Sequence, residues 1–378
     1  MDSLVNLTPL FLLQRILLAY IAASTYQFYL ASPSSPSNST SAGAGDATAL
    51  LAFKSLLFDP HYTLSSWNVN NTMNVCNWHG IACQPEGRRA VTAVRLESLG
   101  LTGMISPAIA GLTFLRVLHL PNNQLNGSIP RELGDLPHLR YLNLSSNALE
   151  GAIPDALSQC SRLHTISIRS NKLQGRIPSS MARCSRLRII NFSNNNLSGS
   201  IPAFGSNSSS SHVTSIILSN NSLTGQIPQS LGNLTSLTLL YLSSNNLVGR
   251  IPPSLGNCMN LTSVYVRINN LEGNIPDSLG QLTRLRYLDL SANRLSGVIP
   301  LSLLNLSSLT TLNLATNRLV GTIPPNMFQT LPELQYLSVS CNDLQGSIPQ
   351  SLSNASQLQL LDLAYNSFSG VIPQSGSY

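Results

Sequence analysis

Three side chains with metal-binding chemistry lie close together near the start of the chain. Cys76, His79 and Cys83 follow one another at spacings of three and four residues. Thiolate sulfur and imidazole nitrogen are ligands that zinc prefers, and a closed zinc site needs four ligands. The sequence offers no fourth ligand nearby. A zinc site is therefore one interpretation of this cluster, but an incomplete one.

Side-chain patterns that carry out catalysis are missing. The sequence contains no Gly-rich phosphate loop, no Gly-x-Ser-x-Gly elbow, no His-Glu-x-x-His helix and no kinase signature. Acidic residues are sparse, with none between Asp155 and Glu272. We therefore predict a binding protein and not an enzyme, with no catalytic residue, no bound metal and no cofactor.

The stretch Leu139–Pro154, LRYLNLSSNALEGAIP, recurs with small changes along most of the chain. Its asparagine returns in steps of 24 residues, with one step of 26 and one of 25. A fixed period of this size with the pattern L-x-x-L-x-L-x-x-N-x-L is the signature of leucine-rich repeats. We predict about twelve repeats over residues 91–373, stacked into one solenoid with a continuous core.

Each repeat is expected to contribute one short strand. In Leu142-Asn143-Leu144 the alternation sends the two leucines inward and the asparagine outward. Stacking places these strands side by side. The predicted fold class is an α/β solenoid: a right-handed leucine-rich repeat superhelix with a parallel β-sheet on its concave face.

The recurring asparagine has a structural role in this prediction. An amide group offers both donors and an acceptor, so it can satisfy backbone groups that a tight, buried turn leaves unpaired. We expect a ladder of these side chains along the solenoid. Its members are Asn123, Asn147, Asn171, Asn195, Asn221, Asn245, Asn269, Asn293, Asn317, Asn342 and Asn366.

The segment before the repeats has the pattern of a cap. DATALLAFKSLL, from Asp46, predicts a helix with Asp46 as its N-cap. This D-x-x-A-L-L-x-F-K pattern, and the W…C-x-W-x-G-x-x-C that follows it, resemble the N-terminal cap of plant leucine-rich repeat receptors. The resemblance implies a cap over residues 46–90 that covers the first coil of the solenoid. A Cys76–Cys83 disulfide would hold such a cap and is the alternative to zinc. The L-x-G-x-I-P ending of each repeat resembles the plant-specific repeat class.

The other cysteines call for a different interpretation. Cys160, Cys184 and Cys258 each stand where other repeats have a leucine, so small buried thiols are expected. Cys160 and Cys184 lie one repeat apart, and a bond between them is the alternative. Cys341 has no obvious partner.

The ends of the chain predict a secretory route. Residues 1–24 contain an apolar run that is too short to span a bilayer. We interpret this segment as a signal peptide cleaved somewhere in 23–31, and an uncleaved anchor is the alternative. Residues 25–45 have the low-complexity composition of a disordered linker. Residues 374–378 are expected to be the truncated end of a longer array. We predict a secreted chain, or one on the extracellular face of the plasma membrane (apoplast).

Asn-x-Ser/Thr motifs would become glycan acceptors on that route. Two of them, Asn143 and Asn191, fall on predicted concave positions, where sugar would cover the early part of the face. The candidates are Asn38, Asn70, Asn126, Asn143, Asn191, Asn196, Asn207, Asn220, Asn233, Asn260, Asn305 and Asn354.

The outward positions of later strands form the predicted binding face. There, aromatic and apolar side chains meet one charge of each sign, and Tyr and Arg are enriched where binding energy concentrates. Tyrosine also suits any sheet surface, so a purely structural role is the alternative. The candidate residues are Ile217, Leu239, Tyr241, Tyr265, Arg267, Tyr287 and Asp289.

A run of basic residues falls in two adjacent repeats without an acid among them. They could meet an anionic partner, such as an acidic or sulfated peptide or wall pectin. Because they spread over several faces, we favour a long-range positive field over a designed site. Nucleic acid is disfavoured by the secretory route. The residues are Arg162, Arg169, Lys172, Arg176, Arg183, Arg186 and Arg188.

From Asp46 to Pro373 the chain resembles the ectodomain of plant leucine-rich repeat receptor kinases, in the group of the rice bacterial-blight resistance receptor and the flagellin receptor. The resemblance implies cell-surface perception of a pathogen pattern or peptide hormone, with a protein or peptide ligand. It also implies a coreceptor of the somatic-embryogenesis receptor kinase type. The matching region holds neither a membrane span nor a kinase, so it should not signal alone.

A second class remains open at this point. Secreted inhibitors of cell-wall-degrading enzymes, similar to polygalacturonase-inhibiting proteins, have a comparable cap and a comparable array of repeats. A non-signalling decoy or pseudogene product is the third possibility. Since the fold supplies only the scaffold, the sequence does not name the ligand.

Overall fold

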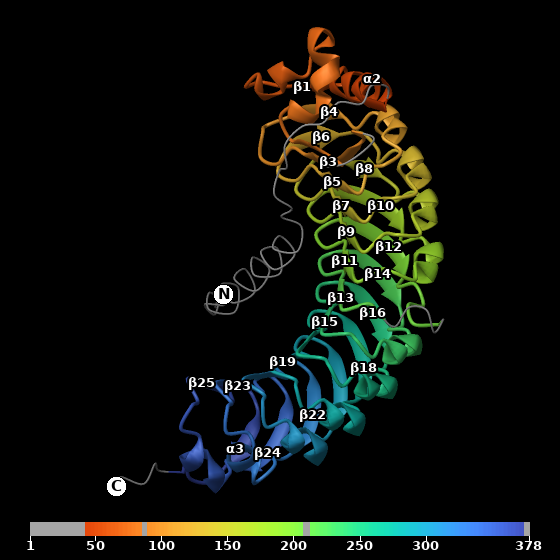
Figure 1. The fold of residues 1–378 in the computed structure, drawn as a ribbon. Helices are drawn as coiled ribbons and strands as arrows, with labels where there is room; N and C mark the ends of the chain where they lie inside the picture. Colours follow the sequence, from red (N-terminus) through yellow and green to blue (C-terminus); the bar gives the residue numbers. More distant parts are fainter. Residues whose placement is uncertain (1–41, 85–88, 207–211, 374–378) are drawn as a thin grey trace.

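The computed structural model describes residues 42–84, 89–206 and 212–373, which form one curved array of coils (Figure 1). Four predictions lie wholly or mostly outside these residues: the signal peptide at 1–24, most of the linker at 25–45, the end at 374–378, and the acceptors Asn38 and Asn207. The arc carries short strands along its inner side and short helices along its outer side (Figure 1).

The inner side is a 13-stranded sheet in which strands follow in chain order, with every pair parallel except β2–β3. Neighbouring repeats pair residue for residue: Val117 with Tyr141, for example. The predicted concave parallel sheet is therefore confirmed. Its strands are β2 (Ile81–Cys83), β3 (Val91–Arg95), β5 (Val117–His119), β7 (Tyr141–Asn143), β9 (Thr165–Ser167), β11 (Ile189–Asn191), β13 (Ser215–Ile217), β15 (Leu239–Tyr241), β17 (Ser263–Tyr265), β19 (Tyr287–Asp289), β21 (Thr311–Asn313), β23 (Tyr336–Ser338) and β25 (Leu360–Asp362).

A second parallel sheet, which was not predicted from the sequence, has ten strands along one flank of the coils. It uses the Leu-x-Gly segment of each repeat: Leu173 is buried, while Gly175 has a φ of 79° that lets the chain bend after pairing. Pro178 comes only after the paired stretch, so it does not prevent a strand here. The strands are β8 (Glu150–Gly151), β10 (Lys172–Arg176), β12 (Asn196–Ser200), β14 (Ser222–Gly225), β16 (Asn246–Gly249), β18 (Asn270–Asn274), β20 (Arg294–Gly297), β22 (Arg318–Gly321), β24 (Asp343–Ser347) and β26 (Ser367–Ser369). A small sheet of β1 (Leu57–Phe58), β4 (Thr102–Met104) and β6 (Gln124–Asn126) precedes it.

The outer side consists of single helical turns. In most repeats the turn starts directly after the proline of the Ile-Pro pair, as at Pro154, whose fixed φ suits this position. Helical turns are wider than the about 4.8 Å between strands, so stacking them bends the array with the strands inside. The turns are η4 (Pro107–Gly111), η5 (Arg131–Asp135), η6 (Asp155–Gln159), η7 (Ser179–Arg183), η9 (Gln229–Asn233), η10 (Pro253–Asn257), η11 (Asp277–Gln281), η12 (Leu301–Asn305), α3 (Met327–Thr330) and η13 (Gln350–Asn354).

The core is one continuous apolar column between the sheets and the helical turns. Each repeat contributes the same inward positions; Leu142, Leu144 and Leu149 are completely buried, and Ile153 is 3% exposed. Burying one such side chain contributes about 1.5–3 kcal/mol. Because every coil covers the next, no repeat has a complete core of its own.

The asparagine ladder forms as predicted. The Asn147 Oδ1 accepts a hydrogen bond from the Leu125 backbone N–H at 3.0 Å. Its Nδ2 donates to the carbonyls of Leu120 and Leu144 at 2.9 and 3.1 Å. The side chain thus satisfies backbone groups of its own repeat and of the one before it. The same hydrogen bonds recur down the array to Asn366.

The cap covers the first coil with one helix and two short helical segments. Helix α2 spans Ala42–Lys54, and η2 (Thr63–Ser66) and η3 (Val69–Asn77) follow it. Trp67 and Trp78 are buried, with stacked rings 5.8 Å apart. The Lys54 ammonium donates to the carbonyls of Leu64 and Trp67, so its apolar stem lies along the cap while its charge is paired with carbonyls.

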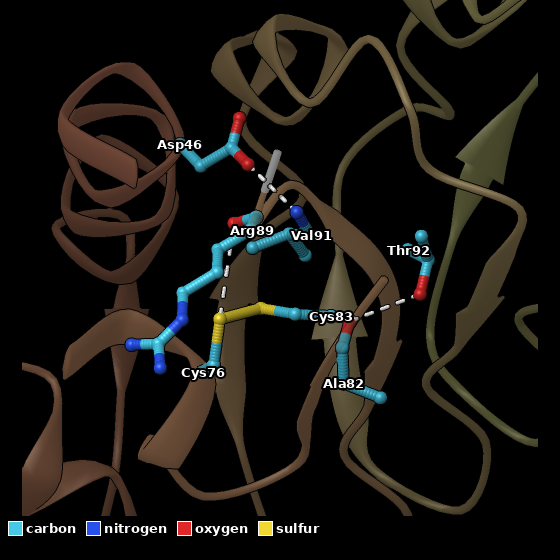
Figure 2. The surroundings of a disulfide bond; sticks show 7 residues. All are labelled: Asp46, Cys76, Ala82, Cys83, Arg89, Val91 and Thr92. Atoms are coloured by element: carbon cyan, nitrogen blue, oxygen red, sulfur yellow. Dashed lines mark hydrogen bonds between the residues drawn. A yellow bond between two sulfur atoms is a disulfide. The ribbon is translucent and has the colours of Figure 1, made fainter. Parts of the chain in front are cut away.

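Asp46 has a different role from the one predicted. The helix begins four residues earlier, at Ala42, so Asp46 lies inside it and is not its N-cap, and residues 42–45 are not linker. Its carboxylate accepts a hydrogen bond from the backbone N–H of Val91 at 2.7 Å (Figure 2). The side chain therefore fastens the cap helix to the first strand of the solenoid.

The Cys76–Cys83 disulfide is present, with Cα atoms 5.5 Å apart (Figure 2). It joins the end of η3 to β2, which pairs with β3. The bond uses both thiols, so the zinc interpretation of Cys76, His79 and Cys83 is wrong.

The remaining cysteines are free thiols. Cys160, Cys184 and Cys258 are buried, as expected for cysteines in leucine positions, and the alternative Cys160–Cys184 bond does not form. The Cys160 thiol donates to the carbonyl of Leu133 at 3.2 Å. Burial raises its pKa to about 12, so it stays protonated and unreactive.

Candidate ligand-binding face

An apolar and aromatic cluster lies on the concave sheet, separate from the main core. It comprises Ile217, Tyr241 and Tyr265, with Leu239 and Tyr287 packed against them, and we call it the concave cluster. The strands β13, β15, β17 and β19 hold these side chains in register: Ile217 pairs with Tyr241, and Tyr241 with Tyr265.

The three tyrosine rings form a continuous series across neighbouring repeats. Tyr241 and Tyr265 meet edge to face with centroids 4.8 Å apart. Tyr265 and Tyr287 are stacked with centroids 6.5 Å apart. Such pairs contribute roughly 0.5–1.5 kcal/mol each beyond their buried area. The rings therefore hold one another in place before any ligand arrives.

Asp289 stands beside the cluster at the end of β19 and is fully buried. Its Oδ1 accepts hydrogen bonds from the Ser291 backbone N–H and hydroxyl, at 3.1 and 2.6 Å. Burial raises the pKa of this carboxyl, while the Ser291 hydrogen bonds and the Arg267 charge act in the opposite direction. Burial likewise raises the pKa of Tyr241 to about 12, so its hydroxyl stays neutral.

The structure brings all seven candidate residues together but does not leave them as open as predicted. Ile217, Tyr241, Tyr265 and Asp289 are buried, whereas Leu239, Arg267 and Tyr287 are partly exposed. Strands about 4.8 Å apart bring side chains of equal register into contact, so large neighbours cover one another. A ligand would therefore touch Leu239, Arg267 and Tyr287 first, and the buried members would support them.

One neighbour of this site is not among the seven candidate residues predicted from the sequence. Tyr336 lies at the equivalent position of β23, and burial followed by the Asp289 charge raises the pKa of its hydroxyl. The signal was available, because Tyr336 and Tyr287 occupy the same position in their repeats. The charge of Asp289 thus acts on a tyrosine two strands beyond Tyr287, with Thr311 at the equivalent position between them.

The two acceptor motifs on the concave face differ in exposure. Asn143 is half-buried on β7. Asn191 on β11 is buried, and its Oδ1 accepts hydrogen bonds from the Ser193 backbone and hydroxyl. Among the other described acceptors Asn260 is half-buried, while Asn70, Asn126, Asn196, Asn220, Asn233, Asn305 and Asn354 are exposed. Glycan attachment at these sites stays a prediction.

Metal-binding groups do not gather on this face: no trio of His, Cys, Asp or Glu suited to a metal occurs in the described part of the chain. The same residues include no helix with the length and apolar character needed to cross a bilayer.

Sequence profiles of known families match almost the whole described region. A leucine rich repeat N-terminal domain matches residues 44–84. A leucine-rich repeat region matches 96–270, and further leucine rich repeats match 259–319 and 316–368. The chain belongs to the leucine-rich repeat proteins.

Its relatives are plant receptor kinases of this repeat class. The receptor kinase-like protein Xa21 of Oryza sativa subsp. japonica is 43% identical over 89 residues, which cover 22% of this chain and 9% of Xa21. The crystal structure of PEPR1–AtPEP1 matches with a TM-score of 0.82 and 36% identity, over 87% of this chain and 46% of that one.

A second solved structure is the Arabidopsis HAESA ectodomain in complex with an N-terminally extended IDA peptide hormone. It matches with a TM-score of 0.76 and 35% identity, over 88% of this chain and 55% of that one. This leucine-rich repeat chain therefore spans about half the length of the receptor ectodomains it matches. The kinases in the relatives' names lie outside the matched region.

Proposed function

We propose that this leucine-rich repeat protein recognises an extracellular peptide or protein ligand through its concave face, in pathogen or peptide-hormone perception. The concave cluster is the observation that carries the proposal. It is a preorganised aromatic surface on the inner sheet, with Arg267 and Asp289 beside it. The HAESA ectodomain, solved in complex with a peptide hormone, has the same fold.

The physical reason is preorganisation. A ligand that lies on Leu239, Arg267 and Tyr287 meets side chains whose neighbours already fix them, so little conformational entropy is lost on binding. Tyr and Arg anchors supply apolar contact and hydrogen bonds together. The charges of Arg267 and Asp289 favour a ligand that carries polar or charged groups next to apolar ones.

The proposed location is the apoplast, by secretion or on the extracellular face of the plasma membrane. The disulfide Cys76–Cys83 supports it, because disulfides persist in oxidising compartments. HAESA has also been solved with IDA and the co-receptor SERK1. By analogy, a leucine-rich repeat coreceptor kinase is a proposed second partner of this chain.

The test is a selection from a displayed library of random peptides against the purified chain. Selected peptides are then measured against a Leu239→Ala/Tyr287→Ala variant by calorimetry. We expect their affinity to fall roughly 30- to 900-fold, since each of the two lost anchors costs about 1–2 kcal/mol. The control is Val298→Ala/Leu301→Ala, which truncates two side chains that are 58% and 66% exposed and lie off the inner sheet.

Two results would contradict the proposal. The first is a selection that yields no peptide with affinity above that for an unrelated repeat protein. The second is a set of peptides that bind the concave variant as tightly as the original chain. Melting temperatures of both variants must stay close to that of the original chain for the comparison to hold.

The alternative function is inhibition of a cell-wall-degrading enzyme, such as a fungal polygalacturonase. The exposed part of the same face is the surface available for an enzyme as well. Inhibition of polygalacturonase by the purified chain, lost in the Leu239→Ala/Tyr287→Ala variant, would favour this alternative over peptide perception. A chain that neither inhibits the enzyme nor selects any peptide would be a decoy or a non-functional product.

A further inference from the structure

A second charged surface lies away from the concave cluster, at the edge where the first inner strands begin. One basic residue directly precedes each of four successive inner strands: Arg116 precedes β5, Arg140 precedes β7, His164 precedes β9 and Arg188 precedes β11. Their backbones are hydrogen-bonded in series: Arg140 N–H donates to the Arg116 carbonyl at 2.8 Å, and His164 N–H to the Arg140 carbonyl at 2.8 Å. Arg188 N–H donates to the His164 carbonyl at 2.7 Å. These four residues form one column.

A parallel column lies two residues earlier in each repeat and consists of His138, Arg162 and Arg186. The two columns are close, because the charges of Arg162, Arg116 and Arg140 act on His138. The imidazole of His164 is affected in the same way by the charges of Arg188, Arg140 and Arg186. We call these seven residues the basic edge.

The charges of the basic edge are not neutralised within the described part of the chain. Arg116, Arg162, Arg186 and Arg188 are exposed, and none of the five arginines forms an ion pair there; the single pair found joins Glu97 and His119. Burial first, and then these arginines, lower the pKa values of His138 and His164. Five like charges held close together cost energy, which an anionic ligand would remove.

An aromatic surface adjoins the first of these charges. The Phe114 ring precedes His138 in its column and stacks on it, with centroids 5.6 Å apart and planes inclined by 19°. Both rings are partly exposed. The edge thus offers flat apolar faces next to arginine forks, which bind carboxylates with two parallel hydrogen bonds.

We propose that the basic edge binds a linear polyuronate, a polysaccharide with one carboxylate on each sugar ring. Each column places a side chain once per strand, about every 4.8 Å. In an extended two-fold polyuronate the carboxylates on one side recur at every second ring, a length similar to two strand spacings of about 9.6 Å, so they can meet alternate arginines. The faces of sugar rings are apolar, and they suit the Phe114–His138 stack.

An acidic polypeptide matches this edge less well. In an extended peptide, side chains on one side recur about every 6.6–6.8 Å, which is twice the rise per residue. This repeat matches neither one nor two strand spacings of about 4.8 Å, so neighbouring carboxylates cannot meet neighbouring or alternate arginines. Four of its seven side chains are exposed and the seven spread over four neighbouring repeats, so a polymer that spans several repeats fits the edge better than a single small anion.

The experiment measures the affinity of the purified chain for a polygalacturonate oligomer, at two salt concentrations. Arg140→Gln/Arg188→Gln is expected to weaken binding roughly tenfold, because two ion pairs are lost. The control is Arg284→Gln/Arg286→Gln, which removes the same net charge from one position of each column at β19, away from the basic edge. The control should change the affinity less than about twofold.

Three outcomes would overturn the proposal. Equal weakening by both variants would mean that net charge, and not the basic edge, attracts the polymer. Equal affinity for a fully methyl-esterified oligomer would remove the carboxylates from the interaction. Tighter binding of poly-glutamate than of polygalacturonate would identify an acidic polypeptide as the partner. Melting temperatures confirm that all variants are folded, and none of the changes touches the concave cluster.

Discussion

At the scale of single residues, the buried polar side chains differ in how completely they are hydrogen-bonded. Each ladder asparagine makes several hydrogen bonds to backbone groups of two repeats, whereas Asp289 on the concave face is buried with only one of its oxygens well paired. The first arrangement stabilises the fold and the second is costly.

Asn245→Ala is expected to destabilise the array by about 1–3 kcal/mol, because it leaves backbone groups unpaired in the interior. The Asn245 Oδ1 accepts from the Leu223 N–H, and its Nδ2 donates to the carbonyls of Leu218 and Leu242. Thermal melting checks the effect. The neighbouring Asn246 is exposed, so Asn246→Ala should change the melting temperature little. Equal effects of the two changes would refute the ladder's structural role.

Asp289→Asn is expected to raise the melting temperature at pH 7 but not at pH 3. The raised pKa means that the folded state disfavours the charged carboxylate. Stability is therefore greatest below the ordinary pKa of about 3.9 and falls as the pH rises through the raised value. An asparagine oxygen can keep the Ser291 hydrogen bonds without this cost. If the gain at pH 3 equalled that at pH 7, packing and not charge would explain it.

At the scale of elements, the turn after each inner strand has one residue in the left-handed region. The residue before each ladder asparagine has a φ between 51° and 56°. Asparagine occupies this position at Asn122, Asn194 and Asn220, and it tolerates the conformation well. Ile268 has a φ of 53° there, although β-branched residues rarely adopt it.

Ile268→Asn should therefore stabilise the protein by about 1 kcal/mol, since it removes backbone strain at a side chain that is 44% exposed. Differential scanning calorimetry measures the change. Ser244→Asn is the matched control, because serine at the same position, with a φ of 55°, is not β-branched and has less strain to lose. A lower melting temperature for Ile268→Asn would show that packing of the isoleucine outweighs its strain.

At the scale of the whole molecule, each coil is stabilised only by the coils next to it. The core is continuous, but each repeat contacts only the repeats beside it, so unfolding can start at one end and spread. The cap, fastened by Asp46 and the disulfide, protects the first end. Loss of the cap should therefore have a local effect that fades along the array.

Cys76→Ser/Cys83→Ser is expected to cost roughly 2–3 kcal/mol, as for a disulfide that closes a short loop. Hydrogen exchange measures where the cost appears. Amides of β3 and β5 should exchange faster, while those of β17 and β19 stay unchanged. Uniformly faster exchange along the chain would instead show that the solenoid unfolds as one cooperative unit. Cys341→Ser, at an exposed free thiol, is the control.

Local sequence by itself determined the repeat period, the inner strands and the asparagine ladder. Each of these depends on residue types within one repeat, such as the L-x-L pair at Leu142 and Leu144. The cap was predicted from its resemblance to plant receptors, and the spacing of Cys76, His79 and Cys83 alone left a zinc site open until the structure showed the disulfide. The second sheet was missed, because a strand as short as Glu150–Gly151 exists only through its neighbours.

Only the tertiary structure decided which side chains of the concave face are buried and which charges lie close together. The rings of Tyr241 and Tyr265 are 24 residues apart in sequence, yet they bury each other. Arg116 and Arg188 lie in one column at the same edge, because the coils between them stack in the same way. The physical reason is common to both cases: strands about 4.8 Å apart bring equivalent positions of successive repeats into contact, so burial and charge density depend on neighbours in space.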